Sequence, residues 1–198
     1  MAKKSTKSSP EALTTQLIEA AFALACERPW HSIALSDIAK EAGIDLSDFR
    51  DLIDEKHDIL VIYGRKLDRQ MLDNVKKIDI DAPVKDRLFE VFMERFDILN
   101  EDRAALKSII GSMKSHPRDA LLSLPHFKKS MLWILEAAHV TSNGIRGAAN
   151  ILALTAIYAE TLYAWQSDDS EDMAKTMATL DKALSRAENI FDKIGHQF

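Results

Sequence analysis

Residue types that carry out catalysis occur in this chain, but they are not grouped in a recognisable catalytic pattern. No two histidines have the spacing of three or four residues that places two imidazoles on one helix face: His31, His57, His116, His126, His139 and His196. The sequence has no phosphate-binding Gly-rich loop and no G-x-S-x-G motif. Its one cysteine, Cys26, stands among apolar residues, which predicts a small buried side chain. We therefore expect no catalysis, no metal ion and no cofactor.

Polar residues that could bind DNA are concentrated in the segment IALSDIAKEAGIDLSDFRDLIDEKHDIL, residues 33–60. Ser36 is expected to cap a short helix, Gly43 allows a tight turn, and a second short helix is predicted from about Leu46 to Ile53. Such a helix-turn-helix places its second helix in the major groove of DNA. The candidate DNA-binding residues are Ser36, Lys40, Asp45, Ser47, Asp48, Arg50 and Lys56.

The charge of this region opposes that interpretation, because DNA is a polyanion. The first 60 residues contain seven Lys and Arg against eleven Asp and Glu, a net charge of −4. Specific binding remains possible if the candidate cations face the duplex and Lys3, Lys4 and Lys7 act as a basic arm. Asp45 or Asp48 would then accept a hydrogen bond from cytosine N4. The alternative is that the helix pair is only a fold element with a solvated acidic face.

The elements that position these residues are all predicted to be helices. The chain has 198 residues, six glycines and five prolines, and is rich in good helix formers, so we predict an all-α fold of about nine helices. We expect a break or kink at Pro125. The expected division is a flexible basic tail at 1–10, a DNA-binding domain at 11–55 and a larger C-terminal domain at 56–198 for ligand binding and dimerisation. Neither a signal peptide nor a membrane span is expected, which favours a cytoplasmic protein.

Aromatic and Met residues of the predicted C-terminal domain recur at helical spacing. Such stripes usually form the core, but they also line apolar cavities between helices, where a hydrophobic small-molecule effector would bind. The candidate pocket residues are Phe89, Phe92, Met93, Phe96, Ile109, Met113, Phe127, Met131, Tyr158 and Trp165.

The last two predicted helices, near 145–166 and 170–194, look apolar on more than one side. This pattern predicts a homodimer in which two helices of each subunit form a four-helix bundle. The candidate interface residues are Ile151, Leu152, Thr155, Met173, Met177, Leu180 and Leu184.

The segment DIAKEAG, residues 37–43, resembles the D-I-A-x-x-A-G core of the TetR family of transcriptional regulators. Apolar Ile44 follows, and Lys56, Ile59 and Leu60 match the basic residue and leucines that open the family's fourth helix. The resemblance implies a three-helix DNA-binding domain, an operator in double-stranded DNA and a helical ligand domain. Arg50 and Leu52 depart from the family, which commonly has an aromatic residue and a His that contact phosphates there.

A second, shorter resemblance concerns YAETLYAWQSDDSEDMAKTMATLDKAL, residues 158–184, which is similar to the C-terminal region of COQ9-type proteins. These relatives of the TetR fold bind isoprenoid lipids, support ubiquinone synthesis and do not regulate transcription. Two functions therefore stay open: a ligand-released TetR-type repressor, and an accessory protein that has lost DNA binding and binds isoprenoid or quinone-like lipid.

Overall fold

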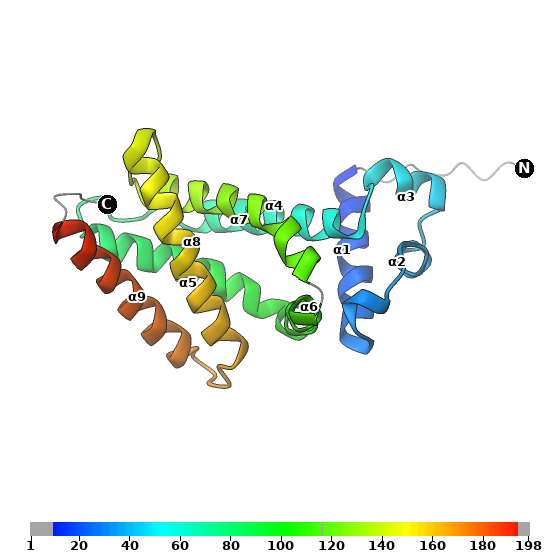
Figure 1. Ribbon diagram of the computed structural model, residues 1–198. Coiled ribbons are helices and arrows are strands. Elements are labelled where there is room, and N and C mark those ends of the chain that lie inside the picture. The colour runs from blue at the N-terminus through cyan, green and yellow to red at the C-terminus, as the bar shows by residue number, and fades with distance from the viewer. Residues whose placement is uncertain (1–9, 116, 194–198) are drawn as a thin grey trace, which may run out of the picture. The chain divides into compact units, whose positions relative to one another are not determined.

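The computed structural model describes residues 10–115 and 117–193, and these fold into helices without any strand (Figure 1). The all-α prediction is thus confirmed. The elements are α1 (Pro10–Glu27), the 3₁₀ helix η1 (Trp30–Ser32), α2 (Leu35–Ala42), α3 (Leu46–Leu52), α4 (Lys56–Asn74), α5 (Val84–Glu101), α6 (Arg103–Ser115), α7 (Pro117–Ala137), α8 (Gly144–Gln166) and α9 (Ala174–Lys193). Within these described residues, no helix is both long and apolar enough to cross a bilayer.

The chain divides into two compact units. Unit 1 comprises residues 1–64 and 102–123, and unit 2 comprises residues 65–101 and 124–198. The predicted domain boundary at residue 55 stays a prediction. The boundaries of the two compact units fall at other residues. The reason is that α6 packs against α1 and η1, so a segment distant in sequence joins unit 1. One hydrogen bond of this packing runs from the Trp30 backbone N–H to Ser112 Oγ at 3.1 Å.

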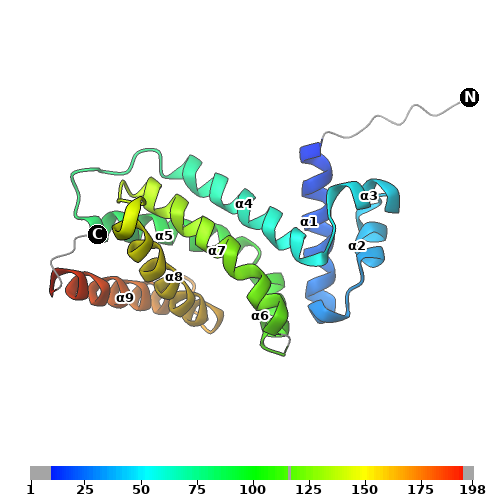
Figure 2. The same cartoon turned by 45° about the horizontal axis from the view of Figure 1, so that its top comes forward.

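Helix α1 is the centre of unit 1. It packs against α2 as well as α6, and both views show α2 and α3 on the same side of it (Figure 2). Its Leu17 and Ala21 are fully buried, and Phe22 lies against Tyr63 with ring centroids 4.7 Å apart. Cys26 is exposed near the end of α1, so the prediction that it is buried was wrong. It falls outside the inward-facing stripe of this helix.

In unit 2, α8 packs along α9, and α5 also packs against α9. The connection between α8 and α9 is built around Asp168, which is 2% exposed. Its Oδ2 accepts hydrogen bonds from the backbone N–H and the hydroxyl of Thr176, each 2.7 Å long. Oδ1 accepts two more, from the backbone N–H and hydroxyl of Ser170. Burial raises the pKa of Asp168, but these hydrogen bonds outweigh it and lower the pKa to about 2.

Of the break or kink expected at Pro125, the break does not occur: α7 continues through this residue. A proline inside a helix removes one backbone donor, a cost that tertiary packing can offset. The start of α9 is capped by two side chains. The Ala174 N–H at its start donates to Ser170 Oγ at 2.9 Å and to Asp172 Oδ1 at 3.2 Å.

Candidate nucleic-acid interface

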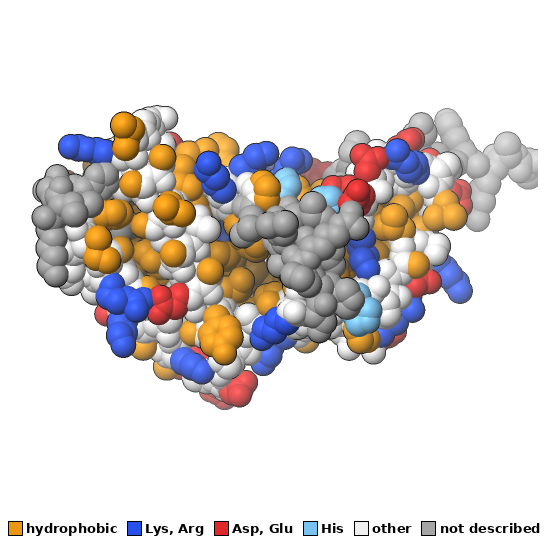
Figure 3. Space-filling view, in the orientation of Figure 1, with side chains coloured by type: hydrophobic (Ala, Val, Ile, Leu, Met, Phe, Trp, Pro, Cys, Tyr) orange, Lys and Arg blue, Asp and Glu red, His pale blue; other side chains and the backbone are white. Residues whose placement is uncertain are grey.

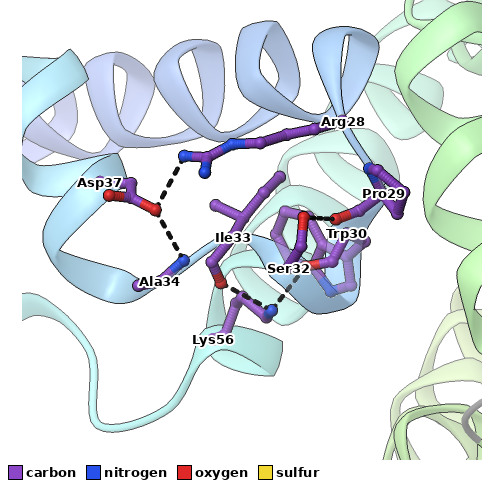
Figure 4. A network of polar contacts seen from close by, with 8 residues as sticks. All are labelled: Arg28, Pro29, Trp30, Ser32, Ile33, Ala34, Asp37 and Lys56. Atoms are coloured by element: carbon purple, nitrogen blue, oxygen red, sulfur yellow. Dashed lines mark hydrogen bonds and ion pairs between the residues drawn. The ribbon is translucent and has the colours of Figure 1, made fainter.

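Helix α2 begins after Ala34, two residues earlier than the sequence suggested. Asp37 Oδ2 accepts the Ala34 N–H at 3.0 Å and the Arg28 Nη2 donor at 2.7 Å (Figure 4). The hydrogen bond from the Ala34 backbone lowers the pKa of Asp37, burial opposes this, and Arg28 lowers it further. Ser36 therefore lies in the first turn of α2 and is not its N-cap, so the capping role predicted for it was wrong. Its exposed hydroxyl can contact a molecule that binds to the surface of α2.

The turn after α2 has the geometry expected of a helix-turn-helix. Gly43 adopts a left-handed conformation with φ of 65° and ψ of 29°. Its N–H donates to the Lys40 carbonyl at 3.2 Å, and the Ile44 N–H donates to the Ala39 carbonyl at 2.9 Å. Ile44 is buried, which fixes the direction in which the chain leaves the turn.

Helix α3 turns a polar face outward. Phe49 is its buried anchor, and Ile53 at its C-cap is buried as well. Leu46 is 61% exposed, because it occupies the first residue of a helix only two turns long. The remaining side chains on the outer side of this segment are exposed: Asp45, Ser47, Asp48, Arg50 and Asp51.

The cationic side chains near α3 differ in how readily they could bind a DNA phosphate. Arg50 pairs with Asp54 one turn later at 2.5 Å, and both side chains are more than two-thirds exposed. Such a surface ion pair contributes about 0–1 kcal/mol, so Arg50 can exchange it for another anion at little cost. Lys40 on α2 is also exposed. Figure 3 shows acidic and basic side chains mixed over the part of the surface formed by α2 and α3.

Lys56 has a structural position that the sequence did not reveal. Its Nζ donates hydrogen bonds to the Trp30 carbonyl at 2.6 Å and to the Ile33 carbonyl at 2.9 Å (Figure 4). It also lies 5.0 Å from the centroid of the Trp30 ring, a cation–π distance. The ammonium group thus ties the start of α4 to the segment before α2. This arrangement does not support the predicted contact of Lys56 with DNA.

The predicted DNA-binding residues are thus brought to the surface of α2 and α3 with that one exception. Ser36 and Lys40 lie on α2, whereas Asp45, Ser47, Asp48 and Arg50 lie on or immediately before α3. The predicted basic arm with Lys3, Lys4 and Lys7 lies outside the described residues. Sequence reasoning missed the Arg28–Asp37 pair, for which the only signal was an acidic residue at the third position of a helix.

The candidate pocket residues fall into two sets. Ile109 and Met113 lie on α6 in unit 1, so they do not share a unit with the others. In unit 2, the Tyr158 ring is surrounded by the rings of Phe92, Phe96 and Phe127, with centroids 6.3, 5.6 and 5.7 Å from it. The other members in unit 2 are buried or half-buried: Phe89, Met93, Met131 and Trp165.

Several candidate dimer residues face the interior of their own unit, so their assignment to an interface was wrong. Leu180 and Leu184 are 0% exposed and Met173 is buried, because the apolar side of α9 packs against α5 and α8 of the same chain. Ile151, Thr155 and Met177 are half-buried. Leu152 is 72% exposed on α8, and it is the member that can meet another molecule most freely.

Comparison with known proteins agrees with this geometry. No protein-family model and no curated protein sequence matches the chain. Among solved structures, a TetR transcriptional regulator from Nitrosomonas europaea is 23% identical, with a TM-score of 0.69 over 88% of this chain and 97% of the regulator. A TetR regulator from Rhodococcus sp. RHA1 is 17% identical, with a TM-score of 0.63 over 90% and 97%.

A TetR-family regulator from Streptomyces coelicolor is also 17% identical and has a TM-score of 0.55 over 91% of this chain and 86% of the regulator. The likeness extends over nearly the whole chain in each case, and the helix-turn-helix found in α2 and α3 is the one that the DIAKEAG motif predicted. The chain therefore has the fold of the TetR transcriptional regulators.

Proposed function

We propose that this protein is a DNA-binding transcriptional regulator of the TetR type, acting as a homodimeric repressor that a hydrophobic small ligand releases from its operator. The observation that carries the proposal is the helix-turn-helix itself. Gly43 turns the chain between two short helices, and α3 keeps its anchor Phe49 inside and its polar residues outside. The similarity of the fold to solved TetR regulators supports the same proposal.

The charge of α3 determines what kind of DNA binding to expect. Lys40 and Arg50 supply the exposed positive charge, while Asp45 and Asp48 repel phosphates. Non-specific binding, which depends on phosphate neutralisation, should therefore be weak, and its salt dependence should be shallow. A carboxylate that enters the major groove accepts a hydrogen bond from cytosine N4 and rejects bases that offer no donor. Specificity would then rest on base contacts more than on the backbone.

The dimer is proposed through an outward face of α8, which keeps Leu152 of the predicted set and leaves out its α9 residues. Ile145, Leu152 and Tyr163 are among the most exposed large hydrophobic residues of the described chain. Exposed Ala148, Ala156 and Ala159 lie between them at spacings of three and four residues, so the six form one stripe along the helix. Small residues in such a stripe let two helices approach closely. A two-fold contact along it would give a dimer with two α3 helices, one for each half-site.

The test is selection of bound DNA from randomised duplexes and genomic fragments at low salt, with purified protein up to micromolar concentration. We expect an enriched sequence with two related half-sites. Arg50→Ala should weaken binding to the enriched duplex by roughly tenfold, whereas Lys66→Ala, an exposed cation of unit 2, should leave it unchanged. Failure to enrich any sequence refutes the proposal.

A second candidate function is an accessory protein that keeps the fold, lacks DNA binding and binds an isoprenoid or quinone-like lipid. Two observations favour it: the carboxylates on the outer face of α3, and the aromatic cluster around Tyr158, within the segment that resembles COQ9-type proteins. Native mass spectrometry of the purified protein would then find bound lipid. Protein without lipid, whose melting temperature does not change on addition of isoprenoid quinones, would exclude this function.

A further inference from the structure

Unit 2 contains a buried arginine that neither the helix-turn-helix nor the proposed dimer uses. Arg95 of α5 is 2% exposed and meets residues from three other helices. Its Nη1 donates to Asp68 of α4, and its Nη2 donates to Ser130 Oγ of α7 at 3.3 Å. Ser130 Oγ donates in turn to Asp68 Oδ2 at 2.9 Å. Tyr158 of α8 lies beneath the guanidinium, 5.5 Å from its central carbon to the ring centroid.

The guanidinium is not fully satisfied. Its buried Nε–H has no hydrogen-bond acceptor among the described residues. Burial lowers the pKa of Arg95, but Tyr158 and Asp68 raise it by more, so the net shift is upward and the group stays charged. A buried donor without an acceptor is expensive, and such groups in folded proteins usually meet a water molecule or a ligand. The Nε–H therefore marks a place where an oxygen atom is expected.

The surroundings of this donor are aromatic. The rings of Phe92, Phe96 and Phe127 enclose Tyr158, which itself contacts the guanidinium. Phe92 and Phe96 are fully buried, whereas Phe127 is half-buried, so the cluster reaches from the arginine toward the surface. In Figure 3 hydrophobic side chains are visible on the surface of α8 and beside it. One polar donor within an apolar wall is the usual composition of a small-molecule site.

The charges already present around Arg95 determine which kind of ligand oxygen can accept this hydrogen bond. Arg95 and Asp68 already neutralise each other, so a ligand carboxylate would add an uncompensated negative charge to a buried site, which is costly. A carbonyl oxygen accepts the same hydrogen bond and adds no charge. We propose that unit 2 binds a neutral, apolar carbonyl compound whose oxygen accepts the Arg95 Nε–H and whose hydrocarbon body contacts the aromatic cluster.

This inference deepens the proposed function, because it names the chemical class of the effector. The test uses three naphthalenes of similar shape: 2-acetylnaphthalene, 2-ethylnaphthalene and 2-naphthoate. Isothermal titration of the full chain without DNA should find the ketone bound roughly tenfold or more tightly than the hydrocarbon, and the acid most weakly. Because no DNA is present, failure of this test leaves the operator-selection result standing, and failure to select an operator leaves this one standing.

The matched variant is Arg95→Met with Asp68→Leu, which removes both charges together and leaves neither one buried alone. It should bind the ketone and the hydrocarbon equally. Circular dichroism checks its fold, and the three-ligand ranking of the unmodified chain is decisive even if the variant does not fold. The proposal is overturned if the ketone and hydrocarbon bind alike, if the acid binds most tightly, or if the ketone does not bind. It is also overturned if the variant, once folded, keeps the preference for the ketone.

Discussion

Replacing Asp168 by Asn tests how the connection between α8 and α9 is held. The carboxylate accepts four hydrogen bonds from Ser170 and Thr176, and an amide would lose the charge and offer one oxygen in place of two. The pKa of Asp168 is about 2 in the folded protein against an ordinary value of 3.8. At about 1.4 kcal/mol per pKa unit, this difference makes the ionised carboxylate stabilise the fold by about 2 kcal/mol near neutral pH.

The sign of the pH dependence follows from the lowered pKa. The stabilisation is fully present above 3.8, where the carboxylate is ionised in both the folded and the unfolded chain. It is lost as the pH falls toward 2, because the unfolded chain then takes up the proton first. About half of it, roughly 1 kcal/mol, should remain at pH 3. The gap in stability between the unmodified protein and Asp168→Asn should therefore shrink by about 1 kcal/mol between pH 7 and pH 3.

Urea unfolding followed by far-ultraviolet circular dichroism measures this gap at both pH values. Glu171→Gln is the matched control, since it removes an exposed carboxylate from the same connection and should change stability by less than about 0.5 kcal/mol. A gap that is the same at pH 7 and pH 3 would show that the carboxylate's charge does not hold the junction. An Asp168→Asn protein as stable as the original at pH 7 would refute the reasoning entirely.

Four further variants test other parts of the structure. Leu152→Glu should give a folded monomer by light scattering, whereas Leu180→Glu should destabilise the fold because Leu180 is fully buried; a folded Leu180→Glu monomer would contradict the assignment. Lys56→Met should keep only an apolar contact with Trp30 and lose the cation–π contact and two hydrogen bonds to carbonyls, lowering the free energy of unfolding by about 1–2 kcal/mol in urea titrations. Gly43→Ala should cost about 1 kcal/mol through its positive φ, since no atom crowds the site; an unchanged unfolding midpoint would argue against that conformation.

The sequence predicted the helix-turn-helix because its signals are local. Gly43 and the apolar residues beside it lie within one short stretch, and the turn needs no distant partner. The position of Lys56 could not be predicted in this way, since it depends on carbonyls 23 and 26 residues earlier in the chain. A lysine at the start of a helix is exposed by default, and only the tertiary fold brings these acceptors to it.

The same difference between local signals and tertiary contacts explains why some residues were wrongly assigned to the dimer interface. The periodicity of the sequence predicts apolar faces on α8 and α9. It cannot show which of these faces packs against other helices of the same chain. Packing of α9 on α5 and α8 decided that Leu180 lies inside and Leu152 outside. Arg95 escaped notice for a related reason. Its position between Phe92 and Phe96 gives no sign of burial, which Asp68 and Ser130 from other helices make possible.

The way in which α3 is anchored has a consequence for how such a protein could change over time. Its attachment depends mainly on Phe49 and Ile53, while the outward residues are held only by weak surface interactions such as the Arg50–Asp54 pair. Substitutions on that outer face therefore carry almost no folding penalty and escape selection for stability. A lineage could pass from a basic to an acidic α3, or back, through folded intermediates at every step. The same independence would let an engineer give this scaffold a new operator by exchanging four or five exposed side chains.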